Sequence, residues 1–272
     1  MPYIKLKKEL ILWDKYIPAK KDNLPTLVFV HGWVQNHTAW NKVVLPLRKL
    51  GYGILLIDLP GHGLSTTPRD IINFDIMRFA KICSNVVKRR KLKKVVLIGH
   101  SLGGMVVQYM CKQIKPAAIV LADTTYQNPL KDASIDISFQ APIISALLYA
   151  LAQRAPQSKR SKLFDFSKHA SQEEIALWLR GANTTNARAL LACLHSIIQL
   201  NSEPILRKIE CPTLLLVGSH DVRTPISRMR QMKKLISNSK LVIIKQSGHN
   251  TNISAPDEFA KNVHNFISSS LL

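Results

Sequence analysis

The stretch VVLIGHSLGG, residues 95–104, joins four apolar residues directly to a G-x-S-x-G pattern. The apolar run predicts a buried strand, and the segment after it predicts a helix. Gly99 and Gly103 flank the turn between them, where a side chain would collide with neighbouring backbone. We expect this turn to raise the hydroxyl of Ser101 above the sheet and to direct the helix N-terminus at it.

Strand-like and helix-like patterns alternate on both sides of this turn, which predicts an α/β fold with a mostly parallel sheet flanked by helices. The expected strands cover residues 10–14, 26–30, 53–57, 94–98, 117–122, 212–217 and 240–244. The expected helices cover residues 39–50, 74–87, 102–113, 226–236 and 256–268.

The alternation stops between residues 125 and 208, where helical patterns cover 141–153, 172–180 and 186–200. A segment of this length is too long for a structureless loop in a compact domain. It predicts a helical lid (cap) inserted between two core strands, over their C-terminal ends. The core itself is then expected to comprise residues 1–124 and 209–272.

The chain is strongly basic, with 38 Lys and Arg against 17 Asp and Glu, a net charge of +21. Such a charge is compatible with nucleic acid, an anionic membrane or an acidic substrate. The one dense cluster, residues 88–94, falls at an expected helix end and contains no interleaved aromatic residues. A solvated helix end is therefore favoured, and no specific nucleic-acid partner is expected.

The cysteines and the apolar runs indicate the compartment. Four cysteines are scattered without a C-x-x-C pair, which argues against a zinc site or a disulfide framework and favours a reducing, cytoplasmic location. The N-terminus lacks an apolar signal core, and no run reaches the roughly 18 residues of a transmembrane segment. The longest run, residues 141–152, is expected to line an apolar pocket rather than to contact a membrane.

A serine nucleophile needs a base, and the base needs an orienting carboxylate. In parallel sheets such groups gather at the C-terminal ends of strands. Asp221 is the first carboxylate after the expected strand at 212–217, and His249 is the first histidine after the strand at 240–244. We predict that Ser101, Asp221 and His249 form a catalytic triad.

An oxyanion intermediate needs two N–H donors, and these are predicted at two backbone positions. Leu102 follows the nucleophile, and Trp33 lies in the loop after the strand at 26–30. No H-E-x-x-H pattern and no G-x-G-x-x-G after a strand is present, so neither a metal nor a cofactor is expected. His31 and His62 are interpreted as structural and His100 as a packing residue, and no role is assigned to His37 or His220.

These motifs together resemble those of the α/β-hydrolase superfamily. They are H-G-W at 31–33, D-L-P-G-H-G-L-S at 58–65, G-H-S-L-G-G at 99–104, G-x-x-D-x-x-x-P at 218–225 and G-H at 248–249. The resemblance implies the Ser-Asp-His triad and a lid inserted at the position given above. Some relatives carry the acid after the preceding strand, where this chain has Asp123, so Asp123 is the alternative to Asp221.

The expected function is cofactor-independent hydrolysis of a carboxylic ester on a small molecule with a hydrophobic acyl or aromatic group. Other chemistries of the superfamily stay open: lactonase, thioesterase, carbon–carbon bond hydrolase, or cofactor-free ring dioxygenase, with which His37 near the H-G-W motif is compatible. A non-catalytic ligand-binding role is a further alternative. The sequence carries no signal of oligomeric state.

Overall fold

One sheet organises the computed structural model, which describes residues 3–7, 10–129, 141–154, 176, 181 and 183–271. In spatial order its eight strands are β1 (Tyr3–Lys7), β2 (Leu10–Ile17), β4 (Gly53–Ile57), β3 (Thr26–Val30), β5 (Val95–His100), β6 (Ala118–Ala122), β7 (Thr213–Gly218) and β8 (Ser239–Ile244).

Six of these strands, from β3 to β8, run parallel, while β1 and β2 form an antiparallel edge. Strands β3 to β6 are buried along their whole length, which explains why they read as continuous apolar runs. The predicted mostly parallel sheet is confirmed. Strand β1 was not among the expected elements.

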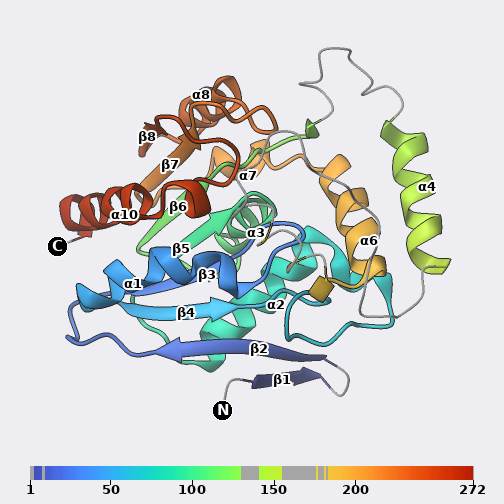
Figure 1. Cartoon of the computed structure of the whole chain (residues 1–272), viewed down its shortest axis with the longest axis horizontal. Coiled ribbons are helices and arrows are strands. Elements are labelled where there is room, and N and C mark those ends of the chain that lie inside the picture. Colours follow the sequence, from blue (N-terminus) through green and yellow to red (C-terminus); the bar gives the residue numbers. More distant parts are fainter. Residues whose placement is uncertain are drawn as a thin grey trace.

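Helices cover both faces of the sheet (Figure 1). Side chains alternate along each strand, so Leu27 and Phe29 face one layer while Val28 and Val30 face the other. The first layer contains α1 (Asn41–Lys49) and α10 (Pro256–Leu271). The second contains α2 (Ile76–Arg89), α3 (Leu102–Met110) and α8 (Ile226–Leu235). Short helices η1 (His37–Trp40), η2 (Ile71–Phe74) and α9 (Thr251–Ser254) lie in the connections.

The chain between β6 and β7, which we call the insertion, contains α4 (Ala141–Arg154), α6 (Ala187–Ile198) and α7 (Glu203–Leu206). Helices α4 and α6 pack together, with Ser145 Oγ 2.7 Å from His195 Nδ1. Figure 1 shows both helices on the side toward which β4 points, beyond the C-terminal strand ends. The helix predicted at 172–180 lies outside the described residues except for residue 176.

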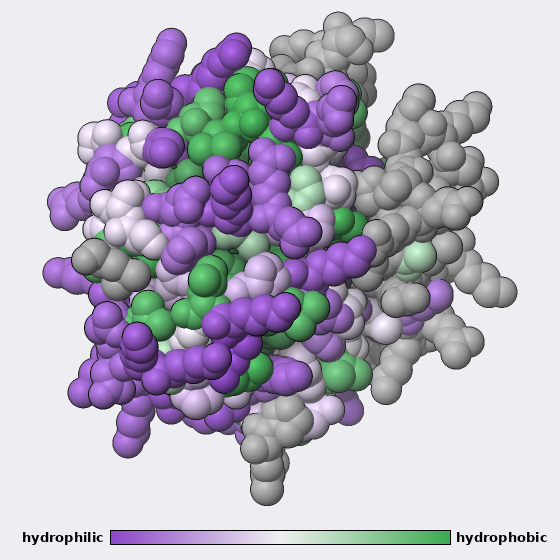
Figure 2. All heavy atoms as spheres, turned by 60° about the vertical axis from the view of Figure 1, so that its left-hand side comes forward, coloured by the Kyte–Doolittle hydropathy of each residue, from purple (hydrophilic) through white to green (hydrophobic). Residues whose placement is uncertain are grey.

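Intramolecular contacts engage part of the basic cluster at 88–94. Arg90 forms an ion pair with the buried carboxylate of Asp14 at 2.8 Å, and Arg89 donates to a backbone carbonyl 2.6 Å away. The Lys94 ammonium lies 3.2 Å from the carbonyl of Asn23. Figure 2 shows hydrophilic side chains spread over the visible face rather than gathered in one patch. In the part of the chain that the structure describes, no helix is long and apolar enough to cross a membrane.

Candidate active site

Ser101 lies at the junction of β5 and α3 with φ 52° and ψ −118°, a conformation that residues with a Cβ rarely adopt. Close backbone packing holds this turn in place. A Cβ on Gly99 would lie 2.3 Å from the carbonyl oxygen of Gly103, and a Cβ on Gly103 would lie 2.1 Å from that of Val30. The two glycines are therefore required by close approach, as the sequence predicted.

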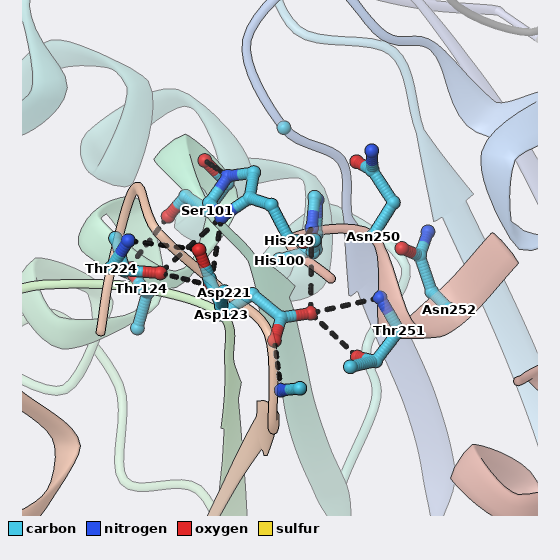
Figure 3. Close-up of polar contacts among 12 residues, drawn as sticks. His100, Ser101, Asp123, Thr124, Asp221, Thr224, His249, Asn250, Thr251 and Asn252 are labelled. Carbon is cyan, nitrogen blue, oxygen red and sulfur yellow. Dashed lines mark hydrogen bonds and ion pairs between the residues drawn. The ribbon is translucent and has the colours of Figure 1, made fainter. Parts of the chain in front are cut away.

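His249 lies between Ser101 and Asp221 (Figure 3). Its Nε2 atom is 3.0 Å from the Ser101 Oγ atom, and its Nδ1 atom is 2.9 Å from Asp221 Oδ2. Because the carboxylate accepts a hydrogen bond from Nδ1, it favours the tautomer whose Nε2 can take the serine proton. The three predicted side chains are thus brought into one hydrogen-bonded chain.

Asp221 is almost fully buried and is hydrogen-bonded on both oxygens. Oδ1 accepts from the backbone amides of Arg223 at 2.8 Å and Thr224 at 2.9 Å, and Oδ2 accepts from the Thr224 hydroxyl at 2.6 Å. Burial by itself would raise the pKa of Asp221, but the charge of His249 and these hydrogen bonds outweigh it and lower the pKa. Sequence reasoning missed Thr224, although an Asp followed by such a turn often bonds the amides two and three residues later.

Asp123 follows β6 and is directed away from His249. Its Oδ1 accepts from the amide of Gly218 at 3.0 Å, and its Oδ2 accepts from the amide and hydroxyl of Thr251 at 3.0 and 2.5 Å. Burial, followed by the charge of Asp221, raises the pKa of Asp123 well above its usual range. In this structure Asp123 joins the loops that carry Asp221 and His249, and Asp221 is the carboxylate that contacts the base.

His100, interpreted from the sequence as a packing residue, also makes a polar contact to the site. Its Nε2 atom lies 2.8 Å from the backbone carbonyl of His249 and 3.7 Å from a carboxylate oxygen of Asp123. Burial, and then the charge of His249, lowers the pKa of His100 to about 3. The neutral ring therefore donates one N–H to the loop of the base. The contact joins residues 149 apart, which left no local signal in the sequence.

The two predicted oxyanion donors belong to neighbouring elements. Leu102 is the first residue of α3, so its amide precedes the first hydrogen bonds of the helix, which run from Gly104 and Met105 to the Ser101 carbonyl. Trp33 lies three residues after the end of β3, the strand that pairs with β5. The half-buried Trp33 side chain donates its indole N–H to the carbonyl of Leu190 in α6 at 3.1 Å.

The other histidines near the site hold loops. His31 accepts from the amide of Leu59 at 3.0 Å, and His62 lies 3.0 Å from the Pro60 carbonyl, in agreement with the structural role expected for both. His37, to which no role was assigned, lies 2.9 Å from the buried carboxylate of Asp58 and stacks on Trp13. His37 is therefore held within the loop structure.

Four apolar side chains of α4, a helix expected to line an apolar pocket, are exposed. Ile143, Leu147, Tyr149 and Leu151 are 73, 58, 40 and 46% exposed. The small residue Ala152 is buried instead, and Ser145 contacts α6. The apolar run thus gives α4 an exposed apolar surface.

The fold and the hydrogen bonds that join Ser101, His249 and Asp221 agree with one protein family. A family model described as the alpha/beta hydrolase fold matches residues 25–256. The chain belongs to the α/β-hydrolase fold family. A similar relative, the AB hydrolase superfamily protein YisY of Bacillus subtilis, is 24% identical over 253 residues and covers 91% of each chain.

A second relative, putative esterase/lipase 2 of Mycoplasma genitalium, is 24% identical over 263 residues, which are 92% of this chain and 91% of the relative. Among solved structures, an esterase from Exiguobacterium antarcticum superimposes with a TM-score of 0.79 over 98% of both chains, at 17% identity. At that identity the superposition supports the α/β-hydrolase fold.

Proposed function

We propose that this α/β hydrolase is a cofactor-independent serine hydrolase that cleaves carboxylic esters through Ser101, His249 and Asp221. The observation that carries the proposal is the position of His249, with Nε2 at 3.0 Å from Ser101 Oγ and Nδ1 at 2.9 Å from Asp221. The esterase name of the Mycoplasma relative supports ester chemistry within the family.

In the proposed reaction Ser101 Oγ attacks the ester carbonyl carbon while His249 Nε2 takes the serine proton. The backbone amides of Trp33 and Leu102 stabilise the resulting oxyanion. His249 then gives its proton to the leaving alcohol, and an acyl-enzyme on Ser101 remains. Water, deprotonated by His249, attacks the acyl carbon and releases the acid. Asp221 stabilises the imidazolium that forms during acylation and again during deacylation.

We further propose that residues 125–208, which make up most of the insertion, form a lid over a core of residues 1–124 and 209–272. It is expected to select a small-molecule substrate with a hydrophobic acyl or aromatic group. The four cysteines are free thiols, which supports a reducing, cytoplasmic compartment as the place of the reaction.

The test combines covalent labelling with turnover. The folded protein is treated with a fluorophosphonate, and the modified peptide is located by mass spectrometry. We expect labelling at Ser101, loss of labelling in Ser101→Ala, and hydrolysis of p-nitrophenyl esters of graded chain length by the wild type alone. A folded wild type that is not labelled, or a Ser101→Ala variant that is labelled equally, would contradict the mechanism.

A further inference from the structure

Residues 33–36, which we call the oxyanion loop, contact the insertion through two side-chain hydrogen bonds. The Trp33 indole N–H donates to the carbonyl of Leu190 at 3.1 Å, and the Asn36 amide donates to the Thr184 hydroxyl at 3.1 Å. Each bond joins residues about 150 positions apart in the sequence. The loop that carries one proposed oxyanion donor is therefore attached to a separate part of the fold.

The backbone of this loop is strained at Val34, which is fully buried and has φ 59°. A β-branched residue in this left-handed conformation persists only where its surroundings hold it. Part of those surroundings belongs to the insertion. Val34 packs against Leu190, and a Cβ on Gly181 would lie 1.9 Å from the Val34 carbonyl oxygen.

The same loop is also joined to the catalytic side of the site. The side-chain oxygen of Gln35 accepts from the amide of Gly32 at 2.9 Å, which closes the turn. Its side-chain nitrogen donates to Asn250 at 3.2 Å, beside His249. The loop thus lies between the insertion and the loop of His249. Because Trp33 belongs to the loop, a displacement of the loop toward or away from the insertion changes the position of the Trp33 amide relative to Ser101.

We propose that the insertion sets the position of the oxyanion loop, with the Trp33 side chain and Gly181 as positioning residues for the oxyanion donor. This inference rests on the proposed function, because it assigns the Trp33 amide to the oxyanion. An oxyanion donor acts only when its nitrogen lies about 2.7–3.1 Å from the developing charge. Because the loop is bonded to Leu190 and Thr184, the position of that nitrogen depends on the insertion.

Two variants separate this role from general packing. Gly181→Ala adds a methyl group against the Val34 carbonyl, so that the contact between residue 181 and the loop must change. Trp33→Phe keeps an aromatic ring and the backbone amide but removes the indole N–H. The matched control is Trp40→Phe, because it makes the same substitution at a buried tryptophan whose indole N–H has no hydrogen-bond partner among the described residues.

Turnover and inhibition report on the oxyanion donor. For Gly181→Ala and Trp33→Phe we expect kcat to fall about 10- to 100-fold with little change in KM, because the donor acts mainly on the transition state. Affinity for a trifluoromethyl ketone, which forms a tetrahedral oxyanion adduct on Ser101, should fall by a similar factor. The double variant should lose less than the product of the two single effects, since both act through one loop. Trp40→Phe should keep kcat within about threefold.

A measurement independent of catalysis follows the loop itself. Hydrogen exchange of the backbone amides of residues 33–36 should be faster in Gly181→Ala and Trp33→Phe than in the wild type, and unchanged in Trp40→Phe. Folded Gly181→Ala protein with wild-type exchange and a kcat no lower than that of Trp40→Phe would overturn the inference. A wild type that neither hydrolyses esters nor reacts with fluorophosphonate would instead refute the proposed function, and the exchange measurement would still test the attachment of the loop.

Discussion

The imidazole of His100 donates its Nε2–H to the backbone carbonyl of His249 at 2.8 Å, so the residue before the proposed nucleophile supports the loop of the proposed base. Removing this donor leaves a buried carbonyl without that partner, which costs about 1–3 kcal/mol. We expect His100→Phe to lower kcat about tenfold, measured on a p-nitrophenyl ester with circular dichroism as the folding control. His100→Gln, which can still donate, should recover most of the loss. Equal kcat for the Phe variant and the wild type would contradict the supporting role.

The two buried carboxylates should respond differently to amide substitution. Asp221→Asn cannot favour the required tautomer of His249, and we expect a loss of kcat of about 10⁴-fold. Asp123→Asn keeps one acceptor oxygen, enough for the amide of either Gly218 or Thr251, and does not touch His249, so its kcat should stay at least about 100-fold above that of Asp221→Asn. Steady-state turnover of both variants checks this, and the reverse order would make Asp123 the acid of the triad.

The same two carboxylates should give stability profiles of opposite sign. The pKa of Asp123 is raised in the fold, so its contribution to stability is complete below its unfolded value near 3.8 and is lost as the pH rises through the folded value. The pKa of Asp221 is lowered, so its contribution is present above 3.8 and is lost as the pH falls through the folded value.

Urea unfolding of the wild type and both Asn variants from acid to neutral pH measures this contrast. The difference in unfolding free energy between wild type and Asp123→Asn should fall with rising pH, whereas the difference for Asp221→Asn should rise. Parallel profiles for the two variants would show that the carboxylates do not titrate differently in the folded protein.

The conformation of Ser101 should reduce stability. A residue with a Cβ at φ 52° and ψ −118° costs about 1–3 kcal/mol, and glycine avoids most of that strain. We expect Ser101→Gly to be more stable than Ser101→Ala by about 1 kcal/mol, with no turnover in either. At an ordinary position the order is the reverse, because glycine is the more flexible residue in the unfolded chain. Chemical denaturation of the two variants decides between these orders.

The sequence predicted the central strands because β3 to β6 are buried on both faces and read as uninterrupted apolar runs. The polar residues that follow β5, β7 and β8 then identified Ser101, Asp221 and His249, since chain order and strand ends determine which residues meet. Strand β1 was not predicted because its five residues include two lysines and it is completed only by pairing with β2.

The supporting contacts of the site were harder to predict. Neither the bond from His100 to the His249 carbonyl nor that from Trp33 to Leu190 follows a local pattern, because each joins segments about 150 residues apart. The exposure of the apolar side chains on α4 could not be predicted from its composition either. A run that is apolar on all sides of a helix does not specify which side faces the core.

The close approach of Gly181 to the Val34 carbonyl has a consequence for protein engineering. Chimeras that replace the insertion with that of a homologue, in order to change substrate preference, also replace the residue beside Val34. A donor segment with any larger residue at this position should yield a chimera that binds its new substrate but turns it over slowly. Donor segments are therefore best chosen first by glycine at the position of residue 181, and only then by the shape of the pocket.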